Sequence, residues 1–173
     1  MSTNWYPHTP YNIKYPKLFE NEKQRMSKIL VGVIIEHFGS TAVPNLEGKG
    51  YIDIYVVVDK NDLNKTSKII QEKLGYEYKE HASIKNKRLF YLRNTDEIRY
   101  HLHLTYTNNP DFIKAIKFRD YLRNHPNEAI EYEEIKKIAS EKANRELTKE
   151  NAKKVYMDTK AKLIDKILDR LEK

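Results

Sequence analysis

The chain has 173 residues, of which 39% are hydrophobic, and its 32 basic and 25 acidic side chains give a formal net charge of +7. It contains no cysteine, which excludes thiol nucleophiles and cysteine-ligated zinc and fits a reducing cytoplasm. No apolar run approaches the roughly 20 residues of a membrane span, and the N-terminus lacks the apolar core of a signal peptide. We therefore expect a cytoplasmic protein without a membrane span, and its basic balance suits either an anionic ligand or a solvated lysine-rich surface.

The first half of the sequence predicts both helices and strands. Pro16 suits the first turn of a helix, and Gly39 and Gly75 stand where a strand and a helix are expected to end. The predicted elements are a helix over residues 16–30, strands over 31–38 and 51–58, and a helix over 63–74. The second of these strands is an almost continuous apolar run, which is typical of a strand covered on both faces.

The second half predicts further strands and then only helices. Strands are expected over residues 76–78, 87–94 and 98–106, and helices over 110–124, 126–144 and 148–172. This order predicts an α/β or α+β fold. We expect a core domain at residues 1–108 and a helical region at residues 109–173 packed against it.

Asp53 interrupts the apolar run of its strand, where a buried carboxylate is costly unless something binds it. Upstream, Gly39 lets the backbone approach a ligand closely, and Ser40 and Thr41 offer hydroxyl and N–H groups to a phosphate. Asp53 can hold a hard cation such as Mg²⁺, which in turn holds phosphate oxygens. A Gly-Ser turn alone is usually only a turn, but the strand, the turn and the embedded aspartate together predict a phosphate and cation site.

His101 and His103 are two residues apart in a predicted strand, so both side chains and that of Arg99 face the same side of the sheet. This basic row suits an anionic substrate or a metal ion, and the alternative is a solvent-facing sheet surface. Glu36 is the best second carboxylate because its strand should neighbour that of Asp53, although an exposed edge charge explains it equally well. Imidazole and carboxylate groups together also suit a transition metal.

Basic residues outside the strands are further candidates for phosphate binding. Lys49 lies in the loop before the strand of Asp53, and Arg119 lies on a predicted helix. A Tyr-x-x-x-Lys spacing occurs twice in the last helices, ending at Lys136 and at Lys160, and could line a phosphate-binding wall. Solvated loop or helix surface is the alternative in each case, and we favour it for Lys136.

These motifs resemble those of a known protein family. A Gly-Ser turn followed by a strand aspartate resembles the nucleotidyltransferase fold, and the wider pattern resembles the GrpB family (the UPF0157 proteins), which is assigned to the nucleotidyltransferase superfamily. The residues that carry this resemblance are 35–44, Leu46, Lys49, 52–54, 99–104, 118–126, Tyr132, Lys136, Tyr156 and Lys160. The resemblance covers nearly all of the chain from Tyr15 onward.

The resemblance implies a nucleotidyltransferase-like mixed sheet with flanking helices and a C-terminal helical bundle. It also implies a nucleotide or another phosphorylated small molecule as the ligand, with Mg²⁺, or alternatively Mn²⁺ or Zn²⁺, as the cofactor. The phosphate-binding residues would be Gly39, Ser40, Thr41, Lys49, Arg99, Arg119 and Lys160. The metal ligands would be Asp53 and Glu36, and the catalytic residues would be Asp53, His101 and His103, since histidine exchanges protons near neutral pH.

Two departures from the nucleotidyltransferase pattern leave the function open. Tyr55 stands two residues after Asp53, where a working enzyme has a second carboxylate, and His101 and His103 occupy the strand that would carry a third. Metal-dependent nucleotidyl transfer and a non-catalytic nucleotide-binding or regulatory module therefore both remain. An RNA-binding accessory protein is a third hypothesis, which rests on the net charge alone.

Overall fold

The structure, a computed structural model, describes residues 4–84 and 88–171. Residues 87 and 172, the predicted start of a strand and end of a helix, lie outside the described residues. Within the described part, the strands are β1 (Ile34–Phe38), β2 (Ile52–Val58), β3 (Glu77–Tyr78), β4 (Arg88–Asn94) and β5 (Arg99–Tyr106). The α-helices of the same part are α1 (Tyr15–Ser27), α2 (Leu63–Glu72), α3 (Pro110–Asn124), α4 (Pro126–Ala143) and α5 (Lys149–Leu171). These elements confirm the predicted mixed α/β fold.

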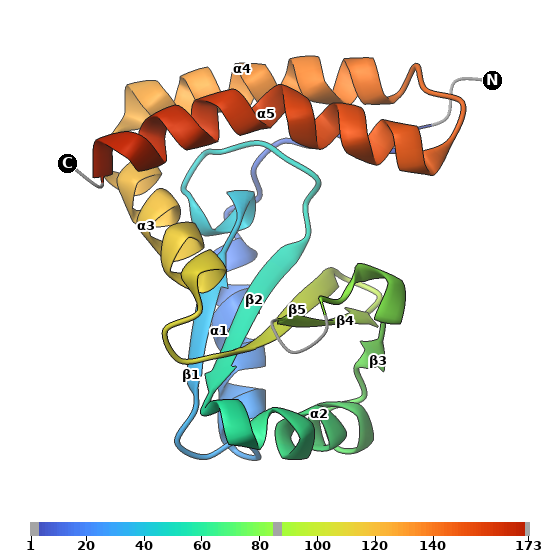
Figure 1. Ribbon diagram of the computed structural model, residues 1–173, viewed down its shortest axis with the longest axis vertical. Coiled ribbons are helices and arrows are strands. Elements are labelled where there is room, and N and C mark those ends of the chain that lie inside the picture. The colour runs from blue at the N-terminus through green and yellow to red at the C-terminus, as the bar shows by residue number, and fades with distance from the viewer. Residues whose placement is uncertain (1–3, 85–87, 172–173) are drawn as a thin grey trace.

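The strands form one mixed sheet in the order β1-β2-β5-β4-β3 (Figure 1). β2 and β5 are parallel, and the other neighbouring strands are antiparallel. A parallel pair needs a crossover connection, which α2, β3 and β4 supply. The register sets Asp53 between Phe38 of β1 and His101 of β5, and it sets Tyr55 beside His103. The pairing therefore brings the strand aspartate and both histidines to neighbouring positions.

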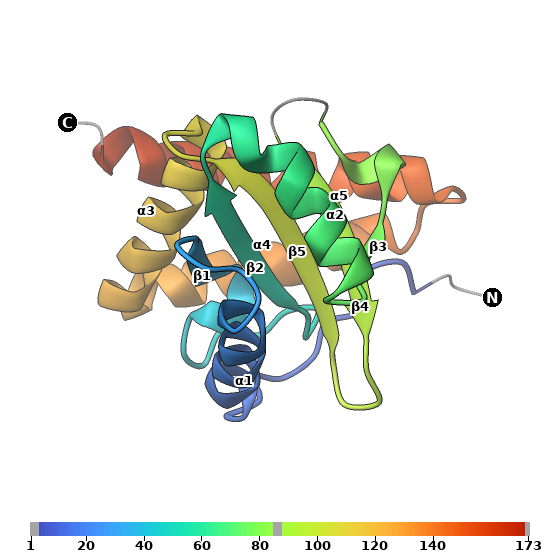
Figure 2. The same cartoon turned by 90° about the horizontal axis from the view of Figure 1, so that it is seen from below.

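Helices α1 and α2 cover one face of the sheet (Figure 2). Side chains on that face, including Ile54 and Leu102, are completely buried in the main apolar core. Because strand side chains alternate between faces, the residues beside them point the other way. Asp53, His101 and His103 therefore share the face that α1 and α2 leave uncovered.

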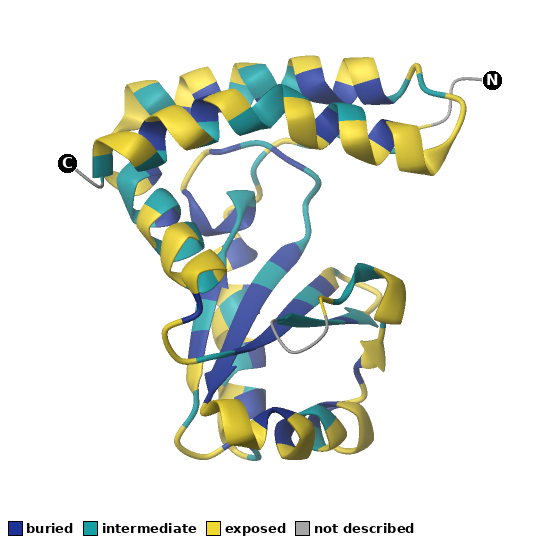
Figure 3. Cartoon of the chain, viewed as in Figure 1, coloured by how far each residue is buried: buried dark blue, intermediate teal, exposed yellow. Residues whose placement is uncertain are grey.

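Helices α4 and α5 lie side by side across one end of the sheet, and α3 joins them to β5 (Figure 1). Their facing sides are buried and their outer sides exposed (Figure 3). Val43 and Leu46, in the loop between β1 and β2, share a second apolar cluster with these helices. Near the N-terminus, Tyr6 stacks on Tyr156 of α5 with ring centres 4.2 Å apart. The helical region thus encloses the β1–β2 loop, while its separation into a domain at residue 109 stays a prediction.

No described helix has both the length and the apolar character that crossing a membrane requires.

Candidate functional site

A polar cavity of about 150 Å³ lies between the sheet and the α4–α5 pair. β2 and β5 contribute Asp53 and His101 from paired positions, and the β1–β2 loop contributes a turn and a lysine. The residues that line it are Gly39, Ser40, Lys49, Tyr51, Asp53, His101, Tyr132, Lys136, Tyr156 and Lys160. The predicted site residues that the structure brings together here are Gly39, Ser40, Lys49, Asp53, His101 and Lys160.

The turn after β1 approaches Asp53 so closely that only glycine fits at position 39. Gly39 has a φ of 75° and a ψ of −171°, a combination nearly restricted to glycine. A Cβ atom added to Gly39 would overlap Oδ2 of Asp53. Ser40 then begins a short 3₁₀ helix, η1 (Ser40–Ala42), which holds this serine at the cavity wall.

Asp53 and His101 form a pair within the cavity. His101 Nδ1 lies 3.2 Å from Asp53 Oδ1, and the two side chains are 19% and 26% exposed, respectively. Burial acts to raise the pKa of Asp53, but the hydrogen bond from His101 and the positive charges around the carboxylate outweigh it, so the pKa is lowered overall. Asp53 is therefore an anion at neutral pH, and it orients the imidazole of His101.

Three lysine side chains converge on the same cavity. Burial, reinforced by the charge of Lys160, lowers the pKa of Lys136 to about 7. Burial and the charge of Lys49 lower the pKa of Lys160 to about 8, and burial lowers the pKa of Lys49 as well. Asp53 is the single carboxylate among the described lining residues. Burial is the largest cause of each shift, so ammonium groups are costly here even though the charge of Asp53 partly offsets that cost.

Tyrosine rings hold these lysines in place. Lys160 Nζ lies 4.3 Å from the ring centre of Tyr156, and Lys49 Nζ lies 4.8 Å from the same ring. Lys136 Nζ lies 5.6 Å from the ring centre of Tyr132 and also donates to a backbone carbonyl of the β1–β2 loop. Cation–π contacts of this kind stabilise an ammonium group by about 0.5–2 kcal/mol. The cavity wall therefore alternates aromatic rings with positive charges.

Most of the chain matches one protein family. Residues 8–170 match the family model described as GrpB protein. The chain belongs to the GrpB family. It is 34% identical over 130 residues to the UPF0157 protein YqkA of Bacillus subtilis, a match that covers 73% of this chain but only 37% of YqkA. It is 32% identical over 152 residues to the glutamate-rich protein GrpB of Alkalihalophilus pseudofirmus, covering 83% of this chain and 87% of that protein.

Solved structures share the fold of this GrpB-family chain. The crystal structure of conserved protein GrpB from Enterococcus faecalis matches with a TM-score of 0.76 at 28% identity, covering 96% of this chain and 100% of that chain. A structure of Cid1 poly(U) polymerase bound to MgATP matches with a TM-score of 0.52 at 13% identity, covering 79% of this chain and 46% of that chain. The second likeness concerns the fold alone. The comparisons confirm the predicted family and the nucleotidyltransferase-like fold.

The polar cavity of this GrpB-family chain does not fit a two-metal centre. Two residues after Asp53, on the same face of the strand, stands Tyr55 rather than a second carboxylate. Among the described residues, no three histidine, cysteine or acidic side chains are grouped so that they could hold a metal ion. Ammonium groups occupy the surroundings where a metal site needs anionic or neutral ligands. Among the described lining residues, Asp53 alone could serve as an acidic metal ligand.

Glu36 and Arg119, predicted as a metal ligand and a phosphate ligand, are bound to each other outside the polar cavity. Arg119 Nη1 donates to Glu36 Oε2 at 2.6 Å and to the carbonyl oxygen of His37 at 2.7 Å. Its Nε donates to Asp120 Oδ1 at 2.7 Å. These contacts occupy the guanidinium group, so Arg119 fastens α3 to β1 next to the turn at Gly39 rather than facing a ligand.

Thr41 and Arg99, two further predicted phosphate ligands, do not line the cavity. Thr41 is 1% exposed, and its Oγ1 donates to the carbonyl oxygen of Tyr51 at 2.9 Å and is hydrogen-bonded to His37. Arg99 Nε donates to Asn94 Oδ1 at 2.7 Å, and its guanidinium lies 5.0 Å from the ring centre of Tyr51. Thr41 thus shapes the loop, and Arg99 reaches the cavity only through the tyrosine ring.

His103 lies in an aromatic cage outside the cavity lining. Its ring centre lies 5.1 Å from that of Phe38, 4.9 Å from that of Phe90 and 5.3 Å from that of Tyr55. Burial lowers the pKa of His103 to about 3, and its buried Nδ1 has no hydrogen-bond partner within the described residues. An imidazole that stays neutral above about pH 3 is a poor acid or base near neutral pH. The predicted catalytic role does not suit this residue.

The cavity also contains Tyr51, which no sequence motif indicates, and Tyr132, Lys136 and Tyr156, for which the Tyr-x-x-x-Lys spacing leaves a phosphate-binding wall and a helix surface as alternatives. Lys136, which we interpreted as helix surface, is only 4% exposed. The signal that identifies it is the repeated Tyr-x-x-x-Lys spacing, because both copies place a ring and a lysine at the same cavity.

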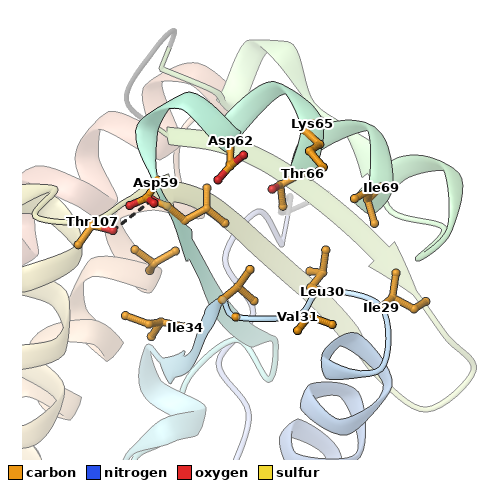
Figure 4. Close-up of a pocket in the computed structure, with 14 residues that line it drawn as sticks. Ile29, Leu30, Val31, Ile34, Asp59, Asp62, Lys65, Thr66, Ile69 and Thr107 are labelled. Atoms are coloured by element: carbon orange, nitrogen blue, oxygen red, sulfur yellow. Dashed lines mark hydrogen bonds between the residues drawn. The ribbon is translucent and has the colours of Figure 1, made fainter.

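A larger cavity, of about 400 Å³, lies at the other end of β2 (Figure 4). Apolar residues from the α1–β1 segment, including Leu30 and Ile34, line one side of it. Its charged lining residues, Asp59, Asp62 and Lys65, are all exposed. Charges in contact with water need no ligand, so this cavity is a weaker candidate than the polar cavity.

Proposed function

We propose that the polar cavity binds the phosphate group of a nucleotide or of another phosphorylated small molecule. The observation that carries this proposal is the convergence of Lys49, Lys136 and Lys160 on one small cavity with a single carboxylate. Enclosed positive charges are costly when unpaired, and a bound phosphate dianion would offset that cost with charge-assisted hydrogen bonds. Binding would therefore restore the ordinary protonation of these lysines.

Each wall of the cavity has a distinct role in this proposal. The lysines donate to phosphate oxygens, and Ser40 adds a hydroxyl donor at the glycine turn. Tyr132 and Tyr156 limit the access of water, which strengthens the interaction between the charges. Asp53 holds His101 on the side of the cavity opposite α4 and α5, so that the imidazole faces the bound group.

Metal-dependent nucleotidyl transfer is a second candidate, favoured by the position of Asp53 on a nucleotidyltransferase-like sheet. The absence of a carboxylate cluster among the described residues speaks against it. Titrations of ATP with and without Mg²⁺, Mn²⁺ or Zn²⁺ separate the two candidates. Binding that needs a cation and is lost in Asp53→Asn would favour transfer.

The phosphate proposal is tested by calorimetric titration of inorganic phosphate and pyrophosphate without a divalent cation. Lys160→Gln is expected to weaken binding about tenfold or more, since a hydrogen bond to a charged group contributes about 1.5–3 kcal/mol. The matched control is Lys162→Gln, the same charge change at an exposed position of the same helix. Equal affinities in the two variants, or no binding by the unmodified chain, would overturn the proposal.

A further inference from the structure

A second, apolar cavity adjoins the polar one. Its volume is about 320 Å³, within the range of small-molecule sites, which begins at about 300 Å³. It lies between α3, α5 and the end of β1, and its apolar lining includes Phe38, Val43, Phe118, Leu122, Ile164 and Leu168. The two cavities share Gly39, Ser40 and Tyr132 as lining residues. A molecule bound at the glycine turn can therefore extend into both.

The apolar cavity has few polar groups that could form hydrogen bonds with a polar ligand. Arg119 lines it, but its guanidinium is bound to Glu36, Asp120 and a backbone carbonyl. Lys114 is exposed to solvent at the cavity surface. A nucleobase buried there would lose its hydrogen bonds to water without replacement, which is costly. A hydrocarbon group has no such loss.

We propose that the ligand is a phosphate ester of an apolar alcohol, with its phosphate in the polar cavity and its hydrocarbon group in the apolar cavity. This inference rests on the proposed phosphate binding and narrows the substrate class. Gly39 and Ser40 lie at the junction, where the ester oxygen would sit. Gly39, Ser40 and Tyr132 line both cavities, so the ester would pass along these residues.

Calorimetric titration of methyl, butyl and hexyl phosphate tests the inference. Affinity is expected to rise by about fourfold per added methylene group, the gain for burying one such group, until the cavity is filled. Ala115→Phe places a ring in the apolar cavity and should abolish this gain while leaving methyl phosphate binding unchanged. Ala115→Ser, which adds only one heavy atom, is the control. Met157→Gln, at a residue that is 52% exposed and lines the same cavity, should reduce the gain and tests the idea if Ala115→Phe fails to fold.

The outcomes separate this inference from the proposed function. If methyl phosphate binds in a manner that depends on Lys160, but affinity does not rise from methyl to hexyl phosphate, the proposal of an apolar tail is overturned and the proposed phosphate binding stands. A chain-length gain that is equal in the unmodified chain, Ala115→Phe and Met157→Gln would overturn it as well. If neither methyl nor hexyl phosphate binds, both proposals fall. A gain with chain length that Ala115→Phe or Met157→Gln reduces, together with loss of binding in Lys160→Gln, supports both.

Discussion

Each end of β2 borders a cavity, and the two cavities differ in whether their charged side chains are enclosed or exposed to water. At the Asp53 end, charged groups are enclosed, and burial lowers the pKa values of three lysines. At the Val58 end, the cavity that Asp59 helps to line (Figure 4) is larger, and its charged side chains are exposed to water. By volume alone, the cavity at the Val58 end would be the stronger candidate for a binding site. Enclosing a charged side chain destabilises the folded protein, so folding alone does not explain why such side chains are present. Enclosed charge is therefore a better sign of function than cavity volume.

The largest expected effect distinguishes two glycines, one at each end. Gly39 and Gly32 both have positive φ, 75° and 72°, but a Cβ atom at Gly39 would overlap Asp53 whereas nothing lies within 4 Å of one at Gly32. Gly39→Ala is expected to lower the free energy of unfolding by about 2–4 kcal/mol, and Gly32→Ala by about 1–2 kcal/mol. Urea unfolding measures both values. Equal losses would show that the contact with Asp53 is unimportant.

The next prediction compares His101 and His103, which lie on the sheet face opposite α1 and α2. His101→Phe leaves Asp53 without its partner and is expected to cost about 1–3 kcal/mol of stability and to weaken phosphate binding. His103 is a neutral imidazole whose Nδ1 has no hydrogen-bond partner among the described residues. His103→Phe puts another aromatic ring in its place, so the free energy of unfolding at pH 7 should change by less than about 1 kcal/mol. Urea unfolding and phosphate titration measure both effects. A larger loss in His103→Phe would reverse the assigned roles.

A third prediction uses pH to separate binding from stability at the Asp53 end. Lys136 and Lys160 have folded-state pKa values of about 7 and 8, below the ordinary lysine value, so the unfolded chain binds more protons between about pH 7 and 10. The free energy of unfolding should therefore rise with pH across this window. Phosphate affinity should instead fall, by up to about tenfold per pH unit above pH 8, because the ammonium groups are lost.

The charges that face these two lysines are those of Lys49, Asp53 and Glu133, and the carboxylates are already ionised in this range. Urea unfolding and phosphate titration at a series of pH values measure both trends. Lys160→Gln should reduce the slope of stability against pH, and Lys162→Gln should not change it. Stability that is flat with pH in the unmodified chain would contradict the assigned environment.

The strands and helices could be predicted from the sequence because apolar periodicity and proline and glycine positions are local signals. The same local signals predicted Asp53, His101 and the glycine turn, since each lies on or beside a strand with a clear pattern. The parallel pairing of β2 with β5 has no local signal, yet it sets Asp53 beside His101. The pair of Asp53 and His101 therefore depends on a register that the sequence does not reveal.

Where the structure places predicted site residues differently, the cause is contact between distant segments. Arg119 and Glu36 lie on α3 and β1, and nothing in their sequence spacing indicates the 2.6 Å contact between them. Lys136 was assigned to the solvent side of a helix because the pattern of α4 does not reveal which face meets the β1–β2 loop. A side chain's role as partner or ligand depends on tertiary packing, which outweighs local pattern.

The smallest expected effect is at the Val58 end of β2. Val31 is 86% exposed and lines the larger cavity, so Val31→Lys should change the free energy of unfolding by less than about 0.5 kcal/mol and leave phosphate affinity unchanged. Urea unfolding and phosphate titration check both expectations. If Val31→Lys weakened phosphate binding without destabilising the fold, the two ends would be coupled through β2. Enclosed charge would then no longer be enough to tell a binding site from an ordinary surface hollow in this chain.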